Sequence, residues 1–343
     1  MSDSTRRIKD AKGSGGGRLL VIALGGNAIQ QPGQDGTFEE QLFNIDGAAR
    51  RIANLVADGH RAVVTHGNGP QVGNLLIQNE LAAKAVAPMP MDVCGAETQG
   101  QIGYIFQQCL ANHLRRRGTA ACVATILTET EVSIGDPAFA KPSKPVGLFY
   151  DKKRATELQM EKGFVMREDA GRGWRRVVPS PDPVRQVQTK AIHDLIAAGV
   201  LVLCSGGGGV PVVRETSGDY RGVEAVIDKD LAAAVLAANL GADALVILTD
   251  VPHVYLHYGT PQQVALGKVG VAEMEAHLAD GQFKAGSMGP KVDASLRFAR
   301  GGGTSIIANL LDLEAALAGK TGTRITREAT AIDRLVGPVA ARS

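Results

Sequence analysis

From Arg18 onward the chain alternates short, almost wholly apolar runs with longer amphipathic segments. The apolar runs predict strands at residues 18–24, 61–65, 119–128, 200–205, 244–249 and 304–308. The amphipathic segments predict helices at residues 39–58, 98–117, 185–198, 229–240, 288–299 and about 311–318. Apolar runs without polar alternation are typical of strands that are buried on both faces. The sequence therefore predicts an α/β protein in which helices cover both sides of a largely parallel central sheet.

One stretch, between about Glu129 and Pro183, breaks this alternation. It has no clear period, gathers many charged residues, and contains six of the fifteen prolines. A structureless loop of this length is uncommon inside a compact domain. We therefore expect an inserted subdomain or lid.

The chain is long enough for more than one lobe, because its 343 residues exceed the ~250 to 300 at which one hydrophobic core usually stops growing. We place the first lobe at residues 18–215, with the insertion at about 129–183, and the second lobe at residues 216–343. Residues 1–17 lack the apolar core of a signal peptide and are predicted to be a disordered leader. A transit segment or a cloning remnant are the alternatives for this leader.

Charge, hydropathy and cysteine spacing exclude several classes of partner. The formal net charge is only +2, and the basic triplet Arg115 to Arg117 stands where a helical pattern ends, so nucleic-acid binding is not expected. No apolar run approaches the ~18 residues that would span a membrane. The four cysteines lie in apolar surroundings and lack metal-binding spacing, which favours reduced core thiols in a cytoplasmic protein and no metal held by side chains.

Glycine is abundant, with 42 residues, and three glycine-rich turns follow predicted strands. Gly25 and Gly26 follow the first strand, HGNGPQVG follows the second, and SGGGGVP follows the strand that begins at Val200. In open α/β sheets, ligands bind outside the carboxyl ends of the strands, and backbone N–H groups in such turns hold phosphate oxygens. One such turn is more often an ordinary turn. Three at one edge of a sheet indicate that the ligand is a phosphate compound.

Two common nucleotide-binding patterns are missing from the sequence. It contains no G-x-x-x-x-G-K-[ST], and no G-x-G-x-x-G opens a first βαβ unit. The chain is therefore neither a P-loop protein nor a typical dinucleotide dehydrogenase.

Three lysines stand where they could neutralise a phosphoryl group during transfer. Lys144 lies in a loop between prolines, and Lys229 and Lys291 are predicted in the first turns of helices, where a positive charge opposes the helix dipole. For each lysine a solvated surface charge is an equally good interpretation. Asp230 could orient a lysine, bind Mg2+ through water, or cap a helix, and Asp228 fits the cap better.

Taken together, ten segments between about Arg18 and Ile325 resemble the carbamate kinases of the amino acid kinase superfamily in their order and spacing. The segments are ALGGNAI, THGNGPQVGNLLIQNE, MDVCGAETQGQIGY, DPAFAKPSKPVGLFY, EDAGRGWRRVVPSPDP, GGGGVPVV, GVEAVIDKDLAA, LTDVPHVYLHYG, GSMGPKV and GTRI. Two of them depart from the expected pattern. GAETQG stands in place of GAMSQG at a helix start by the acceptor site, and KPSKP replaces NPTKP.

The resemblance implies a three-layer αβα sandwich with a protruding subdomain. It places carbamate or carbamoyl phosphate on the first lobe and ATP or ADP on the second. It also implies that Lys144 reaches the site from the subdomain, that Lys229 and Lys291 stabilise the transferring phosphoryl group, and that Asp230 holds lysines in place.

Further site residues are implied in the same way. Those expected to line the phosphoryl site through backbone donors are Gly25, Gly26, Asn27, Gly67, Asn68 and Gly69. Those expected on the nucleotide side are Gly207, Gly208, Thr249, Asp250, Tyr255 and Met288. Members of the family are typically homodimers, use Mg2+ with the nucleotide, and serve arginine or purine-product breakdown.

The predicted reaction is ADP plus carbamoyl phosphate exchanging with ATP plus carbamate, by direct in-line transfer. Two alternatives stay open at this point. The chain could be a kinase of the same superfamily that acts on another small carboxylate or phosphate, or a non-catalytic nucleotide sensor that keeps the fold.

Overall fold

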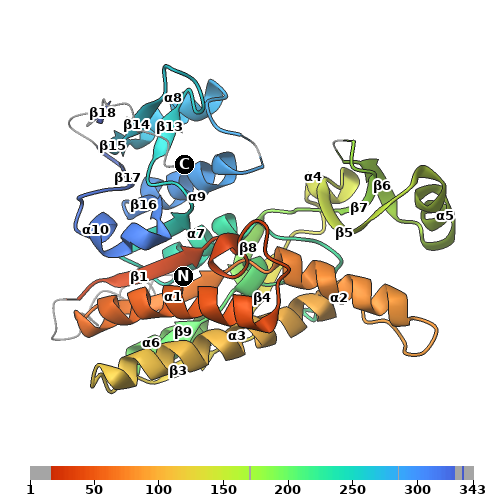
Figure 1. Cartoon of the computed structure of the whole chain (residues 1–343), viewed down its shortest axis with the longest axis horizontal. Helices are drawn as coiled ribbons and strands as arrows, with labels where there is room; N and C mark the ends of the chain where they lie inside the picture. Colours follow the sequence, from red (N-terminus) through yellow and green to blue (C-terminus); the bar gives the residue numbers. More distant parts are fainter. Residues whose placement is uncertain (1–16, 170, 285, 329–333, 336–343) are drawn as a thin grey trace.

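The computed structural model describes residues 17–169, 171–284, 286–328, 334 and 335. Its centre is an eight-stranded sheet with the strand order β15-β17-β16-β12-β1-β2-β9-β3 (Figure 1). In chain order these strands are β1 (Leu19–Leu24), β2 (Arg61–His66), β3 (Val123–Thr125), β9 (Leu201–Leu203), β12 (Ala244–Thr249), β15 (Lys268–Gly270), β16 (Thr304–Asn309) and β17 (Thr323–Thr326). Neighbouring strands are parallel except for β16 and β17. The predicted α/β class with a largely parallel sheet is confirmed.

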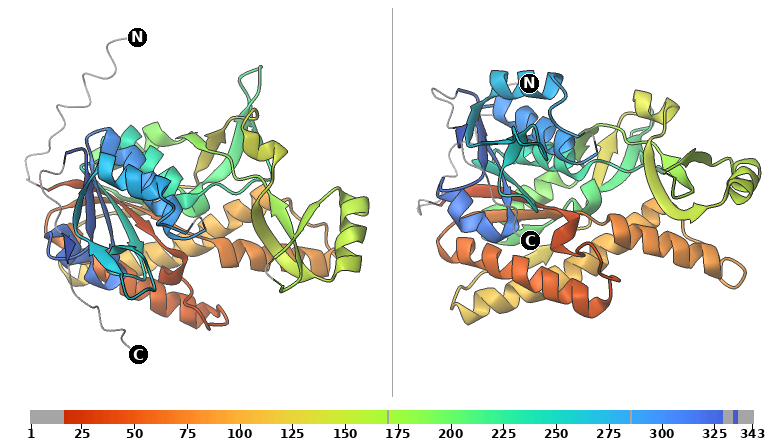
Figure 2. Two further views of the ribbon diagram at one scale, coloured as in Figure 1. Left: turned by 90° about the horizontal axis from the view of Figure 1, so that it is seen from above. Right: turned by 45° about the horizontal axis from the view of Figure 1, so that its top comes forward.

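Helices cover both faces of this sheet and complete three layers (Figures 1 and 2). One face packs against α1 (Phe38–Ala57), α3 (Met91–Arg116) and α10 (Leu313–Leu317). The other packs against α6 (Thr189–Ala197), α7 (Lys229–Asn239), α8 (Val271–Ala279) and α9 (Met288–Arg300).

The central strand β1 shows why its sequence is continuously apolar. Leu20, Ile22 and Leu24 pack in the core beneath α1 and α3, whereas Val21 and Ala23 pack in the core beneath α7 and α9. These five side chains are all fully buried. A polar residue on either face would lose its water without gaining a hydrogen-bond partner, so neither face accepts one.

Local sequence signals define the ends of several helices. The helix α1 begins with a capping box, in which the Glu40 N–H donates to Thr37 Oγ1 at 3.3 Å and the Thr37 N–H donates to Glu40 Oε2 at 3.0 Å. The sequence patterns did not predict the helix α2 (Gly69–Ala82) as a separate element. It begins at the last residue of HGNG and has Pro70 in its first turn.

The protruding subdomain is present and stands to one side of the central sheet (Figure 2). It contains the three-stranded sheet β5-β7-β6, formed by β5 (Lys144–Tyr150), β6 (Val165–Glu168) and β7 (Trp174–Val178). Two helices, α4 (Pro137–Ala140) and α5 (Lys152–Lys162), complete it. The strands that flank it in sequence, β4 (Glu129–Val132) and β8 (Pro183–Gln186), pair with each other and so bring the two ends of the insertion together.

Two smaller sheets complete the fold. The strands β4 and β8 belong to a four-stranded sheet of order β11-β10-β4-β8, with β10 (Val210–Arg214) and β11 (Tyr220–Gly222). A three-stranded sheet of order β13-β14-β18 consists of β13 (Val254–Leu256), β14 (Val264–Leu266) and β18 (Arg334–Leu335).

Three predicted elements have different bounds in the structure. The helix predicted from Thr98 begins at Met91, because buried contacts of Met91 and Cys94 outweigh the low helix propensity of Gly95. The strand predicted at residues 119–128 is limited to Val123–Thr125, since its partner β9 has only three residues. Arg185, predicted as helical, lies in β8 and pairs with Glu131.

Other predictions concern the ends of the chain, the thiols and the membrane. The predicted leader, apart from Gly17, lies outside the described residues. Three of the four free cysteines are buried, but Cys122 is exposed and is not a core thiol as expected. Among the described helices, none has the length and apolar character needed to cross a membrane.

Candidate active site

A cavity of about 730 Å³ opens at the carboxyl edge of the central sheet. Its lining includes residues of the turns after β1, β2 and β9, of the ends of β12 and β16, and of the first turns of α7 and α9. The three glycine-rich turns therefore meet around one space, as expected for the ends of parallel strands. The predicted site residues in the lining are Gly25, Gly26, Asn27, Gly67, Asn68, Gly69, Lys144, Gly207, Lys229, Asp230, Thr249, Asp250 and Lys291.

The backbone of the first two turns divides between the sheet and the cavity. The Gly25 N–H donates to Leu248 O at 3.2 Å, and the Gly67 N–H donates to Leu24 O at 3.3 Å. These two N–H groups extend the hydrogen-bond ladder of the sheet. Because they already donate to carbonyl groups, Gly25 and Gly67 are weaker candidates for phosphate donors than the residues that follow them.

The next residues in each turn are better placed as donors. Gly26 and Asn27 begin the 3-10 helix η2 (Gly26–Ala28), and Asn68 and Gly69 stand at the start of α2. The first N–H groups of a helix have no intrahelical acceptor, and the helix dipole makes this end positive. Both features suit an anion in the cavity.

The third turn follows β9 and is shaped by the side chains around it. It contains the 3-10 helix η3 (Gly206–Gly208), and Gly207 alone of these three residues lines the cavity. A Cβ at Gly206 would lie 2.6 Å from His66 Cε1, and a Cβ at Gly207 would overlap the Asn68 amide. The glycines therefore make room for neighbouring side chains, in addition to exposing backbone.

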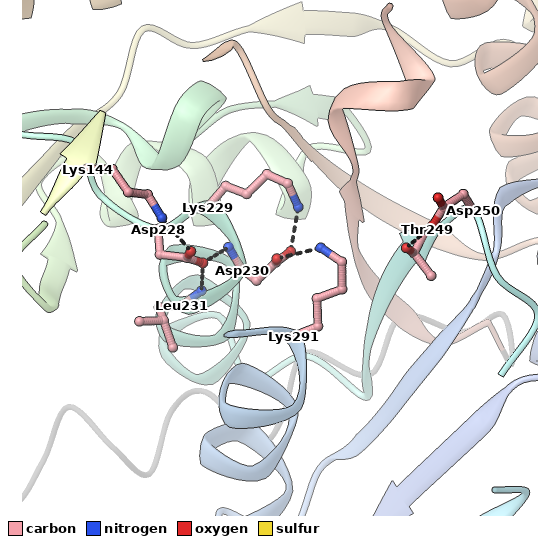
Figure 3. Close-up of polar contacts among 8 residues, drawn as sticks. All are labelled: Lys144, Asp228, Lys229, Asp230, Leu231, Thr249, Asp250 and Lys291. Atoms are coloured by element: carbon pink, nitrogen blue, oxygen red, sulfur yellow. Dashed lines mark hydrogen bonds and ion pairs between the residues drawn. The ribbon is translucent and has the colours of Figure 1, made fainter. Parts of the chain in front are cut away.

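A buried triad of two lysines and one aspartate lies at the floor of the cavity (Figure 3). Asp230 is 3% exposed; its Oδ1 accepts from Lys229 Nζ at 2.5 Å and its Oδ2 accepts from Lys291 Nζ at 3.0 Å. Lys229 is the first residue of α7 and Lys291, 61 residues after Asp230, lies in the first turn of α9, so the starts of two helices meet at one carboxylate.

Charge and burial compete within this triad. Burial opposes the charged form of Asp230, but the two ammonium groups outweigh it and hold the pKa of Asp230 below its ordinary value. Burial, together with the nearby Lys291, lowers the pKa of Lys229 against the attraction of Asp230. An additional anion in the cavity would offset the cost of burying these lysines.

Lys144 reaches the cavity from the protruding subdomain. It is the first residue of β5, and its Nζ lies 3.4 Å from Asp228 Oδ2 (Figure 3). Asp228 also caps α7, because its Oδ1 accepts from the Asp230 N–H at 3.0 Å. The cap that the sequence favoured at Asp228 is confirmed, and the same carboxylate also holds Lys144 beside the triad.

The residues predicted on the nucleotide side separate into two groups. Thr249 and Asp250 lie at the cavity, where Thr249 Oγ1 donates to Asp250 Oδ1 at 2.9 Å and Asn309 Nδ2 donates to Asp250 O at 2.8 Å. Tyr255, Met288 and Gly208 lie outside the lining. Tyr255 is buried in β13, and its ring packs against the ring of Tyr258 with 5.9 Å between their centroids.

Several lining residues were not singled out from the sequence. They are Ala28, Gln31, Pro32, Pro70, Val226, Ile227, Leu248, Gly286, Ser287, Pro290, Asn309, Leu310 and Leu311. Most lie on loops or helix starts whose position depends on tertiary packing. Ser287 and Pro290 stand inside GSMGPKV, Pro70 inside HGNGPQVG and Ala28 inside ALGGNAI, so membership of these segments was the available signal.

The carboxylates at the cavity do not form a metal cage. No group of three or more His, Cys, Asp or Glu side chains with metal-binding geometry occurs within residues 17–169, 171–284 and 286–328. Asp228 and Asp250 both line the cavity. One or two carboxylates together with ligand phosphates are the usual protein environment of Mg2+.

Comparisons with known proteins agree with this geometry. The model of the amino acid kinase family matches residues 18–309. The carbamate kinase of Pyrococcus horikoshii is 53% identical over 310 residues, covering 90% of this chain and 98% of the relative. The carbamate kinase of Trichomonas vaginalis is 47% identical over 309 residues, covering 89% and 98%.

Solved structures give the same result. The carbamate kinase from Giardia lamblia bound to AMP-PNP matches with a TM-score of 0.88 and 44% identity, covering 91% of this chain and 99% of that chain. An N-acetylglutamate synthase from Neisseria gonorrhoeae, 18% identical with a TM-score of 0.52, shares the fold alone. The resemblance inferred from the ten segments is confirmed.

Proposed function

Because the chain belongs to the amino acid kinase family, we propose that it is a carbamate kinase, which transfers a phosphoryl group reversibly between ATP and carbamate. The observation that carries this proposal is the pairing of Lys229 and Lys291 on the two oxygens of Asp230, at the meeting point of the strand-end turns. Phosphoryl transfer mainly requires fixed positive charge and in-line positioning.

The chain's own residues would divide this work. The ammonium groups of Lys229 and Lys291 would face the oxygens of the moving phosphoryl group, while Asp230 holds both lysines in place. Lys144 would add positive charge from the protruding subdomain, and the N–H groups at Gly26, Asn27, Asn68 and Gly69 would donate to phosphate oxygens. Such preorganised donors are worth most where charge develops in the transition state.

Mg2+ would enter with the nucleotide. When bound, it supplies positive charge between the phosphate groups and orients them. Asp228 and Asp250 are the carboxylates at the cavity that fit such an ion. Thr249, Asp250 and Gly207 would lie on the nucleotide side, with carbamate or carbamoyl phosphate on the side of the first two turns.

We further propose that the enzyme acts in the cytoplasm, as a homodimer, in the breakdown of arginine or purine products. The edge strand β3, whose residues are only partly buried, and the exposed side chains of Phe43 and Tyr104 on α1 and α3 leave apolar surface for a second copy. Sedimentation equilibrium should give twice the chain mass of 35.9 kDa, and a monomer at assay concentrations would contradict the dimer.

The direct test is ATP formation from carbamoyl phosphate and ADP with Mg2+. Lys144→Ala and Lys291→Ala should each lower kcat at least about 100-fold, because each removes a charge that stabilises the transition state. Lys190→Ala is the matched control, since Lys190 is 89% exposed and pairs only with Asp194 among the described contacts. Folded wild-type protein without ATP formation would refute the proposal.

The same assay separates the alternatives. Turnover with acetate or an amino acid acceptor that exceeds turnover with carbamate would indicate another kinase of the family. Binding of AMP-PNP without turnover of any acceptor would indicate a nucleotide sensor.

A further inference from the structure

Two consecutive residues of α3, Thr98 and Gln99, stand directly behind the cavity. Both belong to the GAETQG segment, which was expected beside the acceptor site, but neither lines the cavity. They are buried, with 0% and 2% of their surface exposed. Buried polar side chains are stable only with hydrogen-bond partners, so the partners of these two show what the segment does.

Thr98 holds the turn that follows β2. Its Oγ1 donates to Gly95 O at 2.7 Å and accepts from Asn68 Nδ2 at 2.8 Å. Because its one proton is used on Gly95, the Thr98 hydroxyl can only accept from Asn68. This fixes which end of the Asn68 amide faces α3, at a residue that lines the cavity.

Gln99 holds the turn that follows β9, through one intermediate residue. Its Oε1 accepts from the Thr128 N–H at 2.8 Å and its Nε2 donates to Thr128 O at 3.1 Å. Thr128 Oγ1 in turn accepts from the Ser205 N–H at 2.9 Å. Both hydrogen bonds of the Gln99 amide are therefore used to fix the residue that holds Ser205.

The turn after β9 needs such support. Ser205 adopts φ +52°, a left-handed conformation that is uncommon for a residue with a side chain, and Gly207 follows with φ +65°. The amide of Asn68 lies against Gly207, and the Cγ of Gln99 lies 3.1 Å from where a Cβ on Gly206 would be. The two turns thus touch each other, and both touch the same turn of α3.

We infer that Thr98 and Gln99 are positioning residues that set the spacing between the turns at Gly67–Gly69 and Ser205–Gly209. The inference rests on the proposed function, since it deepens the account of how the phosphoryl site is held. Thr98 acts through Asn68, and Gln99 acts through Thr128 and Ser205. Misplacement of a positioned group by about 1 Å can lower a rate by about 100-fold.

Steady-state kinetics tests the role of Thr98. Thr98→Val keeps the shape but removes the acceptor, and it should lower kcat about tenfold or more with a smaller change in KM. Thr98→Ser keeps the hydroxyl and should stay within about threefold of wild type. Thr156→Val is the matched control, because Thr156 is exposed on α5 and, among the described contacts, its hydroxyl donates only to Lys152 O.

A double-mutant comparison shows whether Thr98 acts through Asn68. If it does, Asn68→Ala and Asn68→Ala/Thr98→Val should have the same kcat/KM, because the partner is already gone. Effects of the two substitutions that multiply independently would overturn the inference, as would a Thr98→Val enzyme with wild-type kcat.

Hydrogen exchange gives a readout that does not depend on catalysis. Thr98→Val should speed amide exchange in peptides that cover residues 66–70, and Gln99→Met should speed it at residues 204–209. Unchanged exchange in both peptides would overturn the inference even if the wild-type enzyme is active. If the wild-type enzyme forms no ATP, the proposed function fails, and the exchange pattern alone then decides the positioning roles.

Discussion

At the scale of single residues, Gly26 offers the clearest separation between folding and catalysis. A Cβ at Gly26 would meet no described atom within 4 Å, so it would project into open space beside the cavity. Gly26→Ala should therefore fold with an unchanged melting temperature but lose most of its turnover, because the methyl group would occupy space needed by the phosphoryl group. Activity and thermal unfolding, measured on the same sample, check this.

Two other glycines serve as comparisons for Gly26→Ala. Gly47→Ala, inside α1 with no described atom outside the helix's own backbone within 4 Å of the new Cβ, should keep full activity. Gly25→Ala would bring a Cβ to 3.1 Å from Leu248 O and should lower stability as well as activity. A fully active Gly26→Ala enzyme would make the turn after β1 an ordinary turn.

His66 predicts a dependence of stability on pH. Burial lowers the pKa of His66 from 6.5 to about 4, with a smaller contribution from the charge of Lys229 and opposition from the hydrogen bond to Gly67 O. As the pH falls below 6.5, the unfolded chain binds a proton on His66 while the ring in the folded chain is still neutral. The contribution of His66 to the free energy of unfolding is therefore complete above pH 6.5 and is lost as the pH falls towards 4. The full loss is on the order of 3 kcal/mol.

Urea unfolding at pH 7, 5.5 and 4 measures this effect. The wild-type free energy of unfolding should fall more steeply with acidification than that of His66→Gln, which has no group that titrates at this position. Parallel pH profiles for the two proteins would contradict the assigned pKa.

How far the sequence predicts the site is also visible at single residues. Lys229 and Lys291 could be selected because a positive charge at a helix start opposes the helix dipole, and Asp230 was implied by the family resemblance; the structure brings the three together. That the Gly25 and Gly67 N–H groups are bonded within the sheet could not be predicted, because it depends on the register of β1 against β12 and β2. The sequence placed Thr98 and Gln99 beside the acceptor, but it did not reveal the turns that they hold. Helical spacing does not show which strand end a helix turn contacts.

At the scale of elements, the strand β5 connects catalysis to the docking of the subdomain. Lys144 begins this strand and Tyr150 ends it. The Tyr150 hydroxyl donates to Glu80 Oε2 on α2 at 2.5 Å, and on the neighbouring strand β7 Arg176 pairs with Glu224 at 2.5 Å. Val146, between Lys144 and Tyr150, is buried against Met91. The position of Lys144 therefore depends on how this strand rests on α2.

Removing the hydroxyl from Tyr150 should loosen that contact. Tyr150→Phe keeps the ring but loses one hydrogen bond to a charged group, so kcat should fall about three- to tenfold while the melting temperature changes little. Limited proteolysis of the subdomain should become faster. Equal kcat values for Tyr150→Phe and wild type would exclude a role of this contact.

The bounds of helices and strands were predicted best where burial on both faces of the sheet allows only one interpretation of the sequence pattern. The bounds of β12 are those expected from ALVILT, and those of β1, β16 and α7 differ by one residue. The region from β4 to β8 could not be resolved, because its strands are short, only partly buried, and stabilised by partners far apart in sequence.

At the scale of the whole molecule, one sheet joins the first and last parts of the chain. The strand β1 pairs with β2 on one side and with β12 on the other. The boundary expected between residues 215 and 216 falls inside the hairpin of β10 and β11. Chain length predicts how many cores a protein needs, but it does not show where strands from the two halves share a sheet.

The cavity lining contains equal numbers of opposite charges, with Lys144, Lys229 and Lys291 set against Asp228, Asp230 and Asp250. With a chain that is itself close to neutral, the site exerts little long-range attraction on a polyanion in solution. The site therefore holds an arriving nucleotide only after contact, when lysines that are paired with aspartates form short-range pairs with phosphate oxygens. The rate of its association should accordingly vary little with ionic strength.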